Sequence, residues 1–93
     1  MTEKQFEASV VAYLKTRGCV IKMPRTRFTK AGVSDLLMCF NGRFIAIELK
    51  RPKGVYGITA AQEYFLTAVR AAGGIGGVAR SLDDVKAILE EAL

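Results

Sequence analysis

The chain lacks or has few of the side chains that most often bind zinc or act as catalytic acids and bases. The 93-residue chain contains no histidine and only two cysteines, Cys19 and Cys39. A four-ligand zinc site, or a catalytic mechanism that depends on histidine, therefore cannot be assembled from it. The two cysteines do not form a disulfide framework, so we expect both to be reduced, small core residues of a cytosolic protein.

Long apolar runs are missing as well. The longest run in the central part of the chain is Leu36 to Phe40, far short of the roughly 20 residues that a membrane span needs. The N-terminus, Met-Thr-Glu-Lys-Gln, does not resemble a signal peptide. We therefore expect no membrane partner. The length predicts one domain over residues 1–93, with one main site.

Acidic residues are scarce where basic residues are dense. The net charge is +5, and between residues 15 and 53 the acids are only Asp35 and Glu48. Clustered basic residues are typical of a polyanion-binding surface, most often one that binds nucleic acid, although a solubilising surface is the alternative. The basic residues of this segment are Lys15, Arg17, Lys22, Arg25, Arg27, Lys30, Arg43, Lys50, Arg51 and Lys53.

The centre of the chain carries the strongest structural signal. Two apolar runs flank Asn41-Gly42, which predicts a β-hairpin with a two-residue type I′ turn. This turn fixes the register and places Asp35 opposite Glu48, with their Cβ atoms about 4.5–5.5 Å apart. Lys50 lies on the same face as Glu48 because side chains alternate along a strand.

The remaining elements follow from capping and periodicity. Capping boxes at 2–5 and 59–62 predict a first helix that ends at Gly18 and a second helix over 59–72. Strands are expected at 19–23, 43–50 and 75–79, and Ser81 begins a last helix. The predicted fold is α/β, with a mixed central β-sheet flanked by helices on both faces in the order α-β-β-β-α-β-α.

Two basic loops flank the hairpin. The loop from Arg25 to Gly32 has no regular periodicity and leads into Asp35, so we interpret it as a phosphate-contacting loop. Its one aromatic residue, Phe28, could stack on a base or could equally be a packing anchor. The candidate DNA-binding residues of the two loops are Arg25, Arg27, Lys30, Arg51 and Lys53.

The acidic pair indicates metal chemistry. Opposed carboxylates repel, so Asp35 and Glu48 favour a divalent cation, and oxygen ligands suit Mg²⁺ or Mn²⁺. The carbonyl of Leu49 could be a further ligand, and Lys50 could orient the nucleophile or stabilise a developing oxyanion. This chemistry is phosphodiester hydrolysis. The structural alternative makes Asp35 a turn cap and Glu48 and Lys50 an exposed pair.

Asp35, with Glu48-Leu49-Lys50 thirteen positions further on, resembles the core motif of the PD-(D/E)xK nuclease superfamily. Over residues 2–82 the chain resembles the virus-type replication-repair nuclease (VRR-NUC) domain, which has a restriction-endonuclease-like core. The similar features are a first helix that opens with Glu, a Gly-x-x-Asp strand, Ile-Glu-Leu-Lys-Arg-Pro, and a Gln on the next helix.

The resemblance implies roles for named residues. It makes Asp35, Glu48 and the Leu49 carbonyl ligands of Mg²⁺ or Mn²⁺, and Lys50 the catalytic lysine. The helix-one acid of the family corresponds to Glu3, with Glu7 as the second choice.

Two further positions relate to the family pattern. Gln62 corresponds to the helix glutamine of the site, although its capping-box position explains it equally well. Ser34 replaces the proline that often precedes the aspartate, and we expect no effect on the chemistry.

The resemblance also implies a substrate and an assembly. We expect a structure-selective DNA endonuclease, acting as a homodimer on branched DNA or Holliday junctions, without a nucleotide cofactor, in the cytoplasm of a bacterial cell and possibly encoded by a phage. The alternatives are a modification- or sequence-directed endonuclease and a binding-only module. Candidate interface residues are Gly73 to Val78, Tyr56 and Tyr64, although these glycines also fit a helix C-cap followed by a sheet edge.

Overall fold

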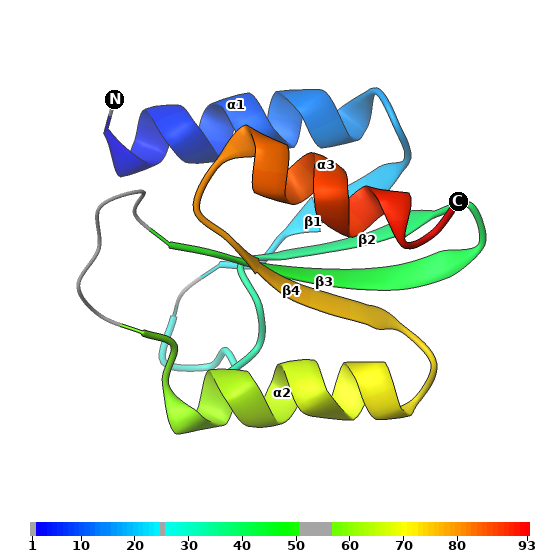
Figure 1. Ribbon diagram of the computed structural model, residues 1–93. Coiled ribbons are helices and arrows are strands. Elements are labelled where there is room, and N and C mark those ends of the chain that lie inside the picture. The colour runs from blue at the N-terminus through cyan, green and yellow to red at the C-terminus, as the bar shows by residue number, and fades with distance from the viewer. Residues whose placement is uncertain (1, 25, 51–56) are drawn as a thin grey trace.

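The computed structural model describes residues 2–24, 26–50 and 57–93, and these form seven helices and strands (Figure 1). Their order is α-β-β-β-α-β-α, as the sequence predicts. The elements are α1 (Glu3–Lys15), β1 (Cys19–Lys22), β2 (Leu36–Phe40), β3 (Arg43–Leu49), α2 (Ala60–Ala71), β4 (Ile75–Ala79) and α3 (Leu82–Glu90).

The four strands form one mixed sheet in the order β1-β2-β3-β4. The pairs β1–β2 and β2–β3 are antiparallel, whereas β3 and β4 are parallel and are connected through α2. Helices α1 and α3 lie on one face of the sheet and α2 lies on the other (Figure 1). The predicted fold class, a mixed sheet flanked by helices on both faces, is therefore confirmed.

The central hairpin has the predicted turn and register. Asn41 and Gly42 have φ angles of 56° and 77°, as a type I′ turn requires. Leu36 pairs with Ile47 at the open end of the ladder. One further step along both strands places Asp35 opposite Glu48.

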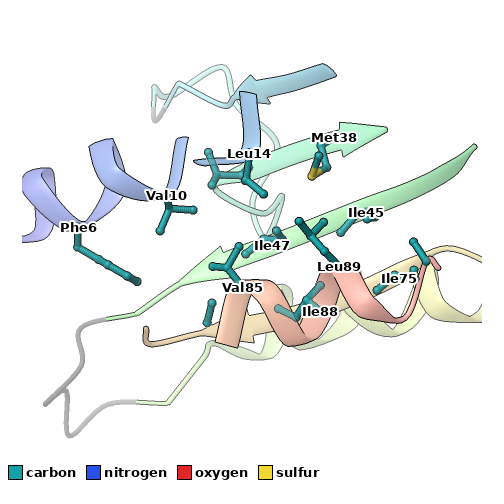
Figure 2. Close-up of a cluster of buried hydrophobic side chains, with 13 residues drawn as sticks. Phe6, Val10, Leu14, Met38, Ile45, Ile47, Ile75, Val85, Ile88 and Leu89 are labelled. Carbon is teal, nitrogen blue, oxygen red and sulfur yellow. The ribbon is translucent and has the colours of Figure 1, made fainter. Parts of the chain in front are cut away.

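Alternation along β3 divides its side chains between two hydrophobic clusters. Ile45 and Ile47 lie on the side of α1 and α3, in the larger cluster shown in Figure 2. Ala46 lies on the opposite side, in a smaller cluster with Leu66 and Val69 of α2. Glu48 lies two residues after Ala46, so its side chain points to the same face of the sheet, the one that α2 covers.

Helices α1 and α2 both begin at complete capping boxes. Thr2 and Gln5 cap α1, and Thr59 and Gln62 cap α2 in the same reciprocal way. Because Thr59 is the N-cap and Ala72 the C-cap, α2 is one residue shorter at each end than the predicted 59–72. In the part of the chain that the structure describes, no helix is long and apolar enough to cross a membrane.

The glycines of β4 allow both helices to approach the sheet closely. A Cβ atom on Gly76 would lie 3.1 Å from the carbonyl oxygen of Leu66 in α2. A Cβ atom on Gly77 would lie 2.7 Å from the Ile88 side chain of α3. The backbone of α2 therefore lies close to Gly76, and β4 is an edge strand, as the sheet-edge explanation of these glycines expects.

The prediction that both cysteines are core residues is wrong. Cys19 and Cys39 are free but exposed, and they face each other across β1 and β2. Cys39 shares the α2 face with Ala46, but α2 packs mainly against β3 and β4. The corresponding face of the first two strands is therefore left uncovered.

Candidate active site

A cavity of about 330 Å³ lies at the carboxyl end of β3. The N-termini of α1 and α2 lie at the same end of the sheet (Figure 1), where helix dipoles favour negative charge. The cavity contains every residue that the sequence analysis assigned to catalysis or metal binding. Its lining consists of Glu3, Phe6, Glu7, Asp35, Glu48, Leu49, Lys50 and Gln62.

The backbone holds the two central carboxylates in place. Asp35 Oδ2 accepts a hydrogen bond of 2.8 Å from the backbone N–H of Leu49. The backbone N–H of Asp35 in turn donates to Glu48 Oε2 at 3.3 Å. These bonds occur just beyond the last ladder pair of β2 and β3, so each carboxylate is positioned by the strand opposite its own.

Glu48 is buried, with only 2% of its surface exposed, so the alternative in which it belongs to an exposed ladder pair is wrong. Gln62 Nε2 donates a hydrogen bond of 2.8 Å to Glu48 Oε1. Gln62 Oε1 accepts from the Thr59 N–H, also at 2.8 Å. The capping-box explanation of Gln62 is therefore confirmed, and the other end of the same amide contacts Glu48.

The chemistry of these oxygens fits a hard divalent cation. A carboxylate offers about four lone-pair sites, so one N–H donor on an oxygen leaves that atom able to bind a cation. Mg²⁺ binds through one or two carboxylates together with water and phosphate oxygens, which matches Asp35 and Glu48. Among the residues that the structure describes, no group of three or more acidic, cysteine or histidine side chains is close enough to hold a metal.

Helix α1 contributes two acids to the cavity wall, and they differ in environment. Glu3 is exposed. Glu7 is partly buried and forms an ion pair with Lys22, with 3.2 Å between Glu7 Oε1 and Lys22 Nζ. Lys22 is not among the site residues that the sequence predicts. It pairs with Leu36, next to Asp35, across β1 and β2, and no short turn in the sequence fixes that register.

A second hollow, of about 440 Å³, adjoins the first. Asp35 and Glu7 line both hollows, and Lys22, Met23 and Pro24 complete the second. Asp35 therefore lies between the two spaces.

Lys50 and Ser34 lie just outside the strands of the hairpin, Lys50 after β3 and Ser34 before β2. Lys50 is partly buried and lines the cavity, and its backbone N–H donates to Ala79 O at 3.0 Å. Ser34, next to Asp35, is 1% exposed, and its hydroxyl has no hydrogen-bond partner in the described part of the chain.

Of the candidate DNA-binding residues, the two that the structure describes, Arg27 and Lys30, do not line the cavity. Arg27 and Lys30 are exposed on the loop between β1 and β2. Arg25, Arg51 and Lys53 lie outside the described residues, as does Tyr56. Tyr64 is 78% exposed on α2, as the interface hypothesis requires.

The chain was compared with known protein families, curated proteins and solved structures. No family model matches the chain, and no curated protein matches it. Among solved structures, a protein described as "VRR_NUC domain protein" superimposes with a TM-score of 0.76 and 20% sequence identity, over 100% of this chain and 88% of the other. The VRR-NUC resemblance inferred from the sequence is thus supported by the structure: the chain has the fold of a VRR_NUC domain protein.

Proposed function

We propose that residues 1–93 form a single VRR-NUC-like nuclease domain, and that it is an endonuclease that hydrolyses DNA with the help of Mg²⁺ or Mn²⁺. The observation that carries this proposal is the arrangement of Asp35 and Glu48. The two carboxylates are bonded reciprocally through opposite strands, in a cavity that Lys50 also lines. Like charges on facing strands repel, and a divalent cation bound between the two carboxylates would offset that repulsion.

Asp35, Glu48 and the carbonyl of Leu49 are the residues that would hold the cation. A divalent metal bound there would activate a water molecule and neutralise charge on a phosphate group. Gln62 fixes the orientation of the Glu48 carboxylate through its 2.8 Å hydrogen bond. The rotamer of Glu48 is therefore set before any substrate binds, as an efficient site requires.

Lys50 supplies the positive charge of the site. It lies two residues beyond Glu48 and lines the same cavity. There it would orient the attacking water and stabilise the charge that develops on the phosphate oxygens. Glu3 or Glu7 would add a carboxylate from α1; the ion pair of Glu7 with Lys22 is made through Oε1.

The substrate we favour is branched DNA, including four-way junctions, cut by a homodimer. A chain with one such site cuts one strand at a time, whereas resolving a junction needs two cuts related by a two-fold axis. A C2 dimer supplies both sites, and it is the commonest closed assembly. Exposed Arg27 and Lys30, with Arg25, Arg51 and Lys53, would contact the phosphates.

A cleavage panel tests the proposal. Linear, flap, splayed and four-way DNA are incubated with Mg²⁺ or Mn²⁺ and the wild-type protein, Glu48→Gln, or Glu63→Gln. Loss of an outer-shell residue typically lowers metal-site activity 10–100-fold, so loss of the Glu48 carboxylate should lower the rate by more than about 100-fold. Glu63 is an exposed acid next to Gln62 on α2, and its substitution should have no effect. Wild-type rates for Glu48→Gln would refute the assignment.

The same panel separates the alternatives. Cleavage of linear duplex at one sequence, without preference for branches, would identify a sequence-directed endonuclease. DNA binding with no cleavage in either metal would identify a binding-only module. A cruciform plasmid tests the dimer, because paired nicks within one binding event linearise the plasmid, whereas a monomer accumulates nicked circles.

A further inference from the structure

Phe28 is a large apolar side chain that the fold does not use. It lies in the loop between β1 and β2 and is 83% exposed. The alternative that the sequence left open, a packing anchor, is therefore wrong for this residue. An isolated exposed apolar residue needs no special explanation, but the construction of this loop and its position add further information.

The loop is held by its own hydrogen bonds. The Thr29 hydroxyl donates to the carbonyl of Pro24 at 2.5 Å, and the Phe28 N–H donates to Thr26 Oγ1 at 3.2 Å. The Thr29 N–H also donates to the Thr26 carbonyl at 3.0 Å. The aromatic ring is thus presented on a loop that is organised locally, which lowers the entropy cost of binding a partner.

The same loop brings positive charge to the ring. The guanidinium carbon of Arg27 lies 4.9 Å from the centroid of the Phe28 ring, within the range of a cation–π contact. Lys30 is exposed two residues further along the chain. A flat aromatic surface beside cations matches the chemistry of a nucleobase attached to a phosphate backbone.

The loop is also fixed close to the candidate active site. Pro24, whose carbonyl binds Thr29, lines the second hollow together with Asp35. The Met23 N–H donates to the Asp35 carbonyl at 2.9 Å. At its other end the loop packs on α2, because a Cβ atom on Gly32 would collide with the backbone of Ala61. The loop that carries Phe28 is therefore anchored at one end beside Asp35 and at the other on α2, the helix that carries Gln62.

We propose that Phe28 stacks on an unpaired base of the DNA, which makes an unstacked nucleotide beside the scissile phosphate a specificity determinant of this nuclease. In a duplex, neighbouring bases cover both faces of each base, so an aromatic side chain can stack only on a base that has left the stack. The inference rests on the proposed function and narrows its substrate to DNA with splayed or unpaired nucleotides.

The absence of tryptophan from the chain provides a direct test. Phe28→Trp introduces a single tryptophan, which can be excited selectively, and keeps an aromatic ring; Phe44→Trp is the matched control. Phe44 is a 47% exposed aromatic residue near the turn of the hairpin, four residues and about 13 Å along the strand from Glu48. Binding is measured in EDTA, so that the result does not depend on cleavage.

Two oligonucleotides of the same length are compared, a blunt duplex and a duplex with a splayed end of unpaired bases. The fluorescence of Phe28→Trp should be quenched by the splayed DNA more than by the duplex, and Phe44→Trp should respond equally to both. Phe28→Ala should weaken binding to splayed DNA by about 5- to 100-fold. Its affinity for duplex should change by less than about twofold, and Phe44→Ala should bind both substrates like wild type.

Equal losses of affinity on both substrates, or no loss on either, would overturn the inference. The inference would also be overturned if Phe28→Ala changed the sedimentation coefficient of the protein but left its DNA affinity unchanged, because Phe28 would then belong to a protein interface. A parallel cleavage assay in Mn²⁺ keeps the two proposals apart. Stacking without cleavage would refute the nuclease proposal alone, and cleavage without a Phe28-dependent preference would refute the stacking proposal alone.

Discussion

Gln62 links the stability of α2 to the position of the Glu48 carboxylate, and this link can be measured without any assay of activity. Gln62→Ala removes the acceptor for the Thr59 N–H and the donor to Glu48 Oε1. The first loss costs about 0.5–1.5 kcal/mol and the second, at a buried charged acceptor, about 1.5–3 kcal/mol. We therefore expect Gln62→Ala to lower the free energy of unfolding by about 2–4.5 kcal/mol.

Helix α1 contains a control with the same geometry. Gln5 Oε1 accepts from the Thr2 N–H at 2.8 Å and the Gln5 N–H donates to Thr2 Oγ1 at 3.1 Å, and the corresponding bonds of Gln62 have the same lengths. Gln5 is exposed, so Gln5→Ala measures the capping contribution alone. Subtracting its effect from that of Gln62→Ala should leave about 1.5–3 kcal/mol for the bond to Glu48.

Urea unfolding in EDTA supplies these values, and thermal melts give a second readout. At about 4–8 °C per kcal/mol for a domain of this size, Gln62→Ala should melt at least about 6 °C below Gln5→Ala. In the Glu48→Gln background the extra cost of Gln62→Ala should shrink, because the charged acceptor is gone. Equal effects of the two glutamine substitutions would show that Gln62 only caps the helix. The proposal that Gln62 orients the Glu48 carboxylate would then be refuted.

Two further predictions concern Asp35 and the residue before it, Ser34. Asp35→Asn relieves about 0.2–1 kcal/mol of repulsion but replaces the charged acceptor of the Leu49 N–H by a neutral one, and these effects oppose each other, so the free energy of unfolding of the metal-free protein should change by less than about 1 kcal/mol. Mn²⁺ should raise the melting temperature of wild type more than that of the variant, and equal shifts would argue against a metal site here. Ser34→Ala removes a buried hydroxyl without a partner in the described chain, so it should stabilise the protein by about 1 kcal/mol in thermal melts, and a lower melting temperature would show that the hydroxyl is satisfied.

The geometry of the hairpin could be predicted from the sequence because its determinants are local. Asn41-Gly42 can adopt the two positive φ angles of a type I′ turn, and a two-residue loop leaves one register. The placement of Asp35 opposite Glu48 then follows from counting along the strands. The capping boxes were predictable for the same reason, because both partners lie within four residues.

Features that depend on how the elements cover one another could not be predicted in this way. The cysteines are exposed because α2 covers β3 and β4 and leaves β1 and β2 open on that face. The ion pair between Glu7 and Lys22 joins α1 to β1, and its formation depends on the packing of the helix against the sheet. The exposure of Phe28 likewise depends on the course of a loop without periodicity.

The structure changes the energetic argument about Asp35 and Glu48. From the sequence the pair appears costly without a cation, because two carboxylates face each other. In the fold each carboxylate accepts a backbone N–H from the opposite strand, and Glu48 also accepts from Gln62. Hydrogen bonds to charged groups are worth about 1.5–3 kcal/mol, whereas the repulsion of a facing pair is worth about 1 kcal/mol or less. The metal-free protein can therefore fold with both acids in place, and binding a cation would not require the site to be rebuilt.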